Sequence, residues 1–226
     1  MFIHDSIADI HEGSLVEYLV GVPYWRAWTF QHFGIPKKPV YRERVPLNSA
    51  PGGPQFRGDI DVILCDPNHF EETVVYQVKR IKVGLSQVRS KAPAKLQDLK
   101  EAVRQAYLLA EIGFWKVLLY ILSEIDAREL NLLSDDRLHF NQIKAKIDTA
   151  IGLCMGNLNS RIGVSSFEFV QTTDSPPHTM DQSGGYLRRQ AAPAAQSYEL
   201  TKWIGELFTS NEPIARGGTP QAPLGT

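Results

Sequence analysis

The spacing of apolar residues divides the first half of the chain into a helix, three strands, a second helix and a fourth strand. Apolar side chains recur at helical intervals over 3–20. Three segments with the length and pattern of strands follow, at 40–45, 59–65 and 73–81. The clearest helical stripe covers 94–111, and the uninterrupted apolar run at 115–122 predicts a strand buried on both faces. This order predicts an α/β domain.

The second half of the chain carries weaker patterns. These are helices at 126–133 and 139–152 and a strand at 165–172. Residues 173–196 are rich in Ser, Pro, Gly, Gln and Ala, so we expect a loop or linker there, after a domain of residues 1–172. An amphipathic helix is expected at 197–210, and the Gly- and Pro-rich end, 211–226, is expected to be disordered.

Polar side chains gather on the two strands that form a predicted hairpin. Side chains alternate faces along a strand, so Asp59 shares a face with Asp61, and Gln77 shares a face with Lys79. A connection symmetric about His69 places Asp61 opposite Gln77 and Asp59 opposite Lys79. Two carboxylates, a carboxamide and an ammonium group are then expected to converge on one patch of sheet.

Two interpretations of this patch are open. Charged groups that lose their hydration need compensation, and a divalent cation such as Mg²⁺, which prefers oxygen ligands, would supply it. Alternatively, the patch is an ordinary solvated sheet face on which Lys79 pairs with the acids. Helices predicted on both sides of the strands favour a covered sheet over a solvated one.

The hairpin resembles the core of a known nuclease family. A glycine followed by Asp-Ile-Asp-Val-Ile (58–63), a turn, and an apolar strand ending in Gln-Val-Lys (77–79) looks like the PD-(D/E)xK, or restriction-endonuclease-like, superfamily. The Gln form is similar to Mrr-type restriction endonucleases and to nuclease domains of phage-defence proteins. The resemblance covers residues 3–122. It implies an αβββαβ core with a mixed central sheet flanked by helices, followed here by C-terminal helical additions.

The resemblance also implies roles for the hairpin residues. Asp61 would be the main ligand of Mg²⁺ or Mn²⁺, joined by the amide oxygen of Gln77 and the main-chain carbonyl of Val78. Asp59 would add a second carboxylate. Lys79 would activate the attacking water and stabilise charge on the phosphate, while the metal polarises the phosphoryl oxygen.

Relatives often add an acid from the first helix. Glu12 and Glu17 are the candidates, and Glu12 is slightly favoured because it lies nearer the start of the helix. Each could equally be a solvated surface acid. His11, near the centre of the apolar stripe, is a further candidate ligand, although a lone histidine on such a face is more often a hydrogen-bonded core residue.

Basic residues flank the proposed site in the sequence. They are Arg80 and Lys82 after the hairpin, and Lys37, Lys38, Arg42 and Arg44 around the first strand. Phosphate contacts by such residues would position a nucleic acid without reading its bases. Ordinary solvated charge is as good an explanation for any one of them. The net charge of -1 weighs mildly against a nucleic-acid partner, but a local basic patch would suffice.

The remaining composition narrows the function classes. Two cysteines exclude a disulfide framework and a four-cysteine zinc site, and no apolar run is long enough to cross a bilayer, so we expect a cytoplasmic protein. The expected function is a Mg²⁺-dependent endodeoxyribonuclease, a possible phage-defence effector that works with a sensor protein or as a homodimer. The alternative is a non-catalytic nucleic-acid- or protein-binding subunit on the same fold.

Overall fold

The structure is a computed structural model of the 226-residue chain. It describes residues 12–21, 26, 39–54, 58–84, 86–87, 98–128, 135–156, 158–171, 182–210 and 215–216.

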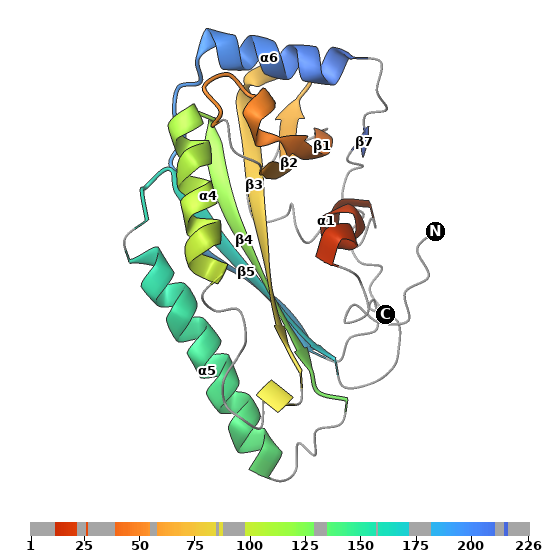
Figure 1. Cartoon of the computed structure of the whole chain (residues 1–226), viewed down its shortest axis with the longest axis vertical. Coiled ribbons are helices and arrows are strands. Elements are labelled where there is room, and N and C mark those ends of the chain that lie inside the picture. The colour runs from red at the N-terminus through yellow and green to blue at the C-terminus, as the bar shows by residue number, and fades with distance from the viewer. Residues whose placement is uncertain are drawn as a thin grey trace.

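A mixed seven-stranded sheet forms the centre of the fold, in the order β6-β5-β4-β3-β2-β1-β7 (Figure 1). The strands are β1 (Val40–Pro46), β2 (Asp59–Asp66), β3 (His69–Val83), β4 (Lys116–Asp126), β5 (Ile162–Gln171), β6 (Gln182–Arg189) and β7 (Ala215–Arg216). The helices are α1 (Glu12–Gly21), the 3-10 turn η2 (Leu47–Ser49), α4 (Asp98–Ile112), α5 (Asp135–Met155) and α6 (Tyr198–Thr209). β3, β4 and β5 run parallel, and every other neighbouring pair is antiparallel.

Helices cover both faces of this sheet. One core cluster joins α4, α5 and α6 to one face of the strands. A second cluster joins Val16, Leu19 and Val20 of α1 to the opposite face, and Figure 1 shows α1 on the other side of the sheet from α4 and α5. Every residue of β4 between its two ends is buried, as expected for a central parallel strand with helices on both sides.

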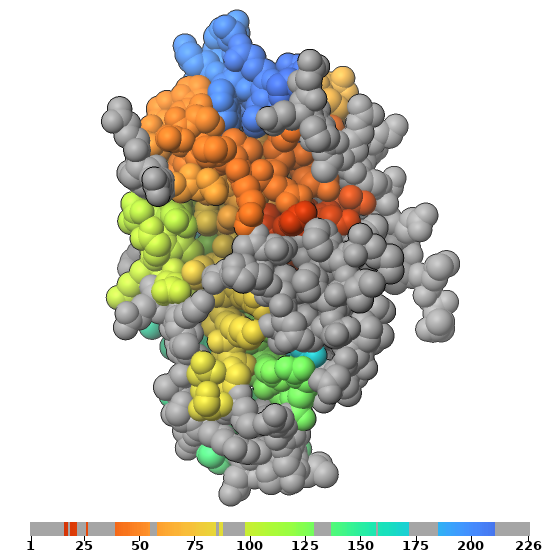
Figure 2. Space-filling model, turned by 45° about the vertical axis from the view of Figure 1, so that its right-hand side comes forward, coloured from red at the N-terminus to blue at the C-terminus, as the bar shows by residue number. Residues whose placement is uncertain are grey.

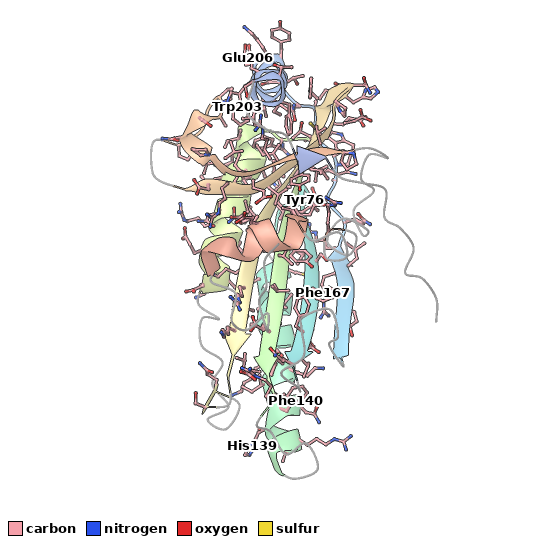
Figure 3. All side chains as sticks on the ribbon, turned by 90° about the vertical axis from the view of Figure 1, so that its right-hand side faces the viewer. Tyr76, His139, Phe140, Phe167, Trp203 and Glu206 are labelled. Carbon is pink, nitrogen blue, oxygen red and sulfur yellow. The ribbon has the colours of Figure 1, made fainter. Side chains whose placement is uncertain are left out.

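The sheet separates between β2 and β3. Their pairing runs from Asp66↔His69 only to Val62↔Tyr76, whereas β2 stays with β1 as far as Pro46↔Asp59. β3 continues alongside β4 to Val83↔Ile125. Figure 3 shows the consequence: β1 and β2 run across the upper part of the molecule, and the long strands continue downward. We call the point where β2 leaves β3, at Asp61, the fork.

The predicted class is confirmed as an α/β fold with a mixed sheet flanked by helices. The order of helix, three strands, helix and strand is also observed, and β2 and β3 form an antiparallel hairpin with the expected register over Val62–Leu64. The last helix, expected at 197–210, is α6. Of the first helix, expected from residue 3, the structure describes the part from Glu12 onward.

Three predictions for the second half were wrong in part. Residues 173–196, expected as a loop, contain the edge strand β6, whose Gly184-Gly185 pair gives no apolar alternation to detect. Residues 126–128, expected in a helix, are the end of β4 and a turn. The tail 211–226 contributes β7, which pairs with β1, and its other residues lie outside the described part. No described helix is long and apolar enough to span a membrane.

Gly163 on β5 provides a test of how tightly the sheet is packed. A Cβ atom added there would lie 2.6 Å from Leu118 Cδ2 and 2.9 Å from the main-chain nitrogen of Ala191. We therefore expect Gly163→Ala to lower the free energy of unfolding by about 1–3 kcal/mol, because the surrounding core must shift. Urea denaturation followed by circular dichroism measures the loss.

The matched control is Gly152→Ala in α5, where an added Cβ meets nothing within 4 Å. Alanine is the better helix former, so this variant should be more stable than the parent by up to ~1 kcal/mol. Equal stability of the two variants would contradict the packing described for Gly163.

Candidate active site at the β2–β3 fork

Asp61 stands where the hydrogen bonds between β2 and β3 stop. Its Oδ2 accepts a hydrogen bond from the main-chain N–H of Val78 (2.7 Å) and another from Nε2 of Gln77 (2.7 Å). The carboxylate therefore occupies the position that a main-chain carbonyl of β2 would take if the ladder continued. The convergence of Asp61 with Gln77, expected from side-chain alternation, is present in the structure.

The main chain of Val78 adds a second oxygen to this place. In an antiparallel ladder, one residue directs its N–H and its C=O toward the same neighbouring strand. Since the N–H of Val78 points to Asp61, its carbonyl is also directed into the fork. A carboxylate, a carboxamide and a main-chain carbonyl are thus gathered between the two strands.

The surroundings of Asp61 disfavour the ionisation of its carboxyl group. Burial raises the pKa of Asp61 to about 7, and the nearby charge of Asp59 raises it as well. The hydrogen bond from Val78 and the positive charges of Arg44 and Lys79 act in the opposite direction. Asp59 itself is exposed. A cation bound at the fork would favour the charged form of Asp61 and relieve the cost of its burial.

Lys79 lies close to this carboxylate but is held by another acid. Its Nζ is 3.4 Å from Oδ2 of Asp98, the first residue of α4, and the Lys79 side chain is only 20% exposed. The positive charge of Lys79 nevertheless lowers the pKa of Asp61. The sequence analysis missed Asp98, since nothing in the local pattern indicates that the start of α4 meets the second half of β3.

Glu43 of β1 is a second acid whose pKa is raised. Burial raises the pKa of Glu43 to about 7, and the charge of Glu17 contributes in the same direction, while Arg44 opposes it. In the space-filling view, α1 (red) lies directly against the β1–β2 segment (orange) (Figure 2). The structure therefore places Glu17, a candidate for the helix acid, beside β1. The side chain of Glu12 and all of His11 lie outside the described residues.

Two of the predicted phosphate-binding arginines are engaged in the interior. Arg42 is 9% exposed, and its Nη2 donates to the carbonyl of Leu207 (3.0 Å) and to Ser210 Oγ (3.2 Å) at the end of α6. Arg80 is buried in an ion pair with Glu124 of β4, with Nε 2.8 Å from Oε2. These side chains tie elements together, so neither belongs to a surface that receives DNA.

Of the other four basic candidates for phosphate binding, the structure describes two. Arg44 and Lys82 are exposed. Lys37 and Lys38 lie outside the described residues. Of the six basic candidates, Arg44 of β1 and Lys82 of β3 are therefore the two that are exposed within the described part of the chain.

A cavity of about 250 Å³ lies elsewhere, between α5 and strands β4 to β6. Its two cations are already paired with acids of the same walls, Lys144 with Glu168 (2.6 Å) and Arg188 with Asp148 (2.6 Å). These pairs link α5 to the sheet. Within the described residues, no group of three or more His, Cys, Asp or Glu side chains is placed to hold a metal, so a metal site at the fork would rely on amide and carbonyl oxygens.

Comparison with known protein families and with curated proteins found no match for this chain.

The raised pKa of Asp61 predicts how stability depends on pH. Because this pKa rises from 3.8 to about 7 on folding, the folded protein keeps a proton that the unfolded chain releases. The stability that protonated Asp61 contributes is fully present below the pKa of this group in the unfolded chain. It is lost as the pH rises through the pKa of Asp61 in the folded protein. In EDTA, we expect this group alone to lower the free energy of unfolding by on the order of 4 kcal/mol between pH 4 and pH 8.

Urea titrations of the parent and of Asp61→Asn test this expectation. Asparagine cannot ionise and can still accept the Val78 N–H, so the variant should lose much of the pH dependence. Glu43→Gln is the matched control, because the pKa of Glu43 is also raised to about 7. It should remove a separate share of the slope. An unchanged slope in Asp61→Asn would show that this carboxylate is not held as described.

Proposed function

We propose that this chain is a divalent-metal-dependent nuclease that hydrolyses DNA phosphodiester bonds. The observation that carries the proposal is the fork itself: the Asp61 carboxylate contacts Gln77 and the main chain of Val78, with Lys79 next along the same strand. A surface salt-bridge network would not explain why a carboxylate is buried where a sheet separates.

The oxygen groups at the fork suit Mg²⁺ or Mn²⁺. Mg²⁺ takes one or two carboxylates and fills its other positions with neutral oxygens, water and phosphate. Asp61 and the carbonyl of Val78 would be ligands as they stand. Gln77 turns its amide nitrogen to Asp61, so a half-turn of the carboxamide would be needed to offer its oxygen. Asp59 is the nearby carboxylate that could join them.

The remaining residues have separate tasks in this proposal. A bound metal would polarise the phosphoryl oxygen and make water a stronger nucleophile. Lys79 would stabilise the negative charge that develops on the phosphate and position the attacking water. Asp98 holds the Lys79 ammonium group, which limits the orientations of a long side chain before substrate arrives.

The arrangement of elements supports the proposal. α1, the strands β1 to β3, α4 and β4 follow the αβββαβ order of the restriction-endonuclease-like core, and the proposed site lies on its second and third strands. A role in defence against foreign DNA, a sensor partner and a homodimer that cuts both strands belong to the same proposal by resemblance to Gln-x-Lys nucleases.

A second candidate is a non-catalytic subunit that grips nucleic acid or a protein. Two observations favour it: Gln77 brings no negative charge to the site, and Lys79 is paired with Asp98. Such a module would bind DNA with or without metal and would leave it intact.

Lys79→Ala distinguishes the two functions. We expect Mg²⁺-dependent cleavage of plasmid and linear DNA by the parent, none in EDTA, and a loss of at least ~100-fold in the variant, since the group that stabilises the phosphate charge is gone. Gel assays with DNA and RNA substrates measure the rates and the substrate preference.

Lys202→Ala in α6 is the matched control. This lysine also forms an ion pair, with Glu206 at 3.8 Å, but the pair is exposed and lies on α6, away from the fork. It should cleave at the parental rate. Binding of DNA without cleavage under every metal condition would support the non-catalytic subunit instead.

Metal binding has its own prediction, independent of cleavage. At pH 8, Mg²⁺ or Mn²⁺ at about 100 times its dissociation constant should stabilise the parent by about 2.7 kcal/mol. Asp61→Asn lacks the charged ligand, so adding the metal should change its melting temperature little. A metal-induced shift of equal size in the variant would place the metal away from Asp61.

A further inference from the structure

Arg44 has an unusual backbone conformation. Within the described part of the chain it is the one non-glycine residue with a positive φ, at 51°. This left-handed region is unfavourable for a residue with a Cβ atom, and glycine or asparagine tolerates it better. Strained residues of this kind gather at functional sites, where a particular side chain is required in spite of the cost.

The strained residue lies next to the fork. The pairs on either side of it are Glu43↔Val62 and Val45↔Ile60. Arg44 is therefore opposite Asp61, at the level where β2 leaves β3. Side-chain alternation along β1 also changes here: Val40 and Val45 belong to one core cluster although they are five positions apart, where strict alternation would put them on opposite faces. The left-handed conformation of Arg44 coincides with this change.

The side chain of Arg44 is exposed, and it makes no hydrogen bond or ion pair with the residues the structure describes. It nevertheless acts on the site, because its positive charge lowers the pKa of Asp61 and that of Glu43. Arg42, two residues earlier, is in contrast fixed to the end of α6. β1 thus carries one arginine that ties elements together and one that remains available beside the fork.

We propose that Arg44 contacts the phosphate of the substrate at the Asp61 site, and that the strained backbone of β1 is what delivers it there. The inference rests on the proposed nuclease function and adds to it a second cation. Lys79 approaches the fork from β3 and Arg44 from β1. A guanidinium group offers paired donors that match two phosphate oxygens, which a lysine ammonium does not. Such a contact positions the phosphate and stabilises its developing charge.

The test compares two substitutions that distinguish the effect of the guanidinium group from the effect of the strained backbone. Arg44→Gly removes the guanidinium group and also makes the positive φ easy to adopt. Arg44→Lys keeps a positive charge and the same backbone cost. Melting temperature, DNA affinity in EDTA as a function of salt, and Mg²⁺-dependent cleavage are measured for both and for the parent.

We expect Arg44→Gly to melt at or above the parental temperature and to cleave about 100-fold more slowly. The slope of its DNA affinity against salt should fall by about one counterion. Arg44→Lys should melt with the parent and keep more activity than the glycine variant. Parental cleavage and salt dependence in Arg44→Gly would overturn the inference while the nuclease proposal stands, as would a large loss of stability in that variant. An inactive parent would instead refute the nuclease proposal.

Discussion

The site depends on a carboxylate that replaces part of a strand. At the fork, β2 turns away with β1, and the N–H of Val78 would lose its partner if Asp61 did not accept it. A buried N–H without a partner is costly, and so is a buried carboxylate without a positive charge. The main chain is satisfied, but the carboxylate keeps a raised pKa. The fold thus buries the carboxyl group of Asp61, whose charged form a bound cation would stabilise.

Neighbouring residues of β3 have different partners because their side chains lie on opposite faces of the sheet. Lys79 meets Asp98 at the start of α4, while Arg80 points the other way into the buried ion pair with Glu124. Removing one partner of such a pair leaves an uncompensated charge in the interior. The pair therefore links β3 to β4 just beyond the residues that carry the proposed chemistry.

The net charge of the groups around the fork is so small that one bound ion would change its sign. Asp59, Asp61 and Asp98 are opposed by Arg44 and Lys79. When Asp61 is ionised, these groups sum to one negative charge, which repels a phosphate. A bound divalent cation would reverse that sign, as the proposed function requires. The modest net charge of the whole chain is compatible with a local site of this kind.

The sequence by itself determined the order of the elements from α1 to β4, together with the hairpin and its register over Val62–Leu64, because periodicity and turn residues are local signals. It also brought Asp61 to Gln77, since alternation and register suffice for that. The tertiary structure alone decided the rest: Asp98 reaching Lys79, Glu17 beside Glu43, Arg42 and Arg80 turning inward, and β6 completing the edge. Each of these joins segments far apart in the chain, and a local pattern records which residues are charged but not which partner the packed elements bring to them.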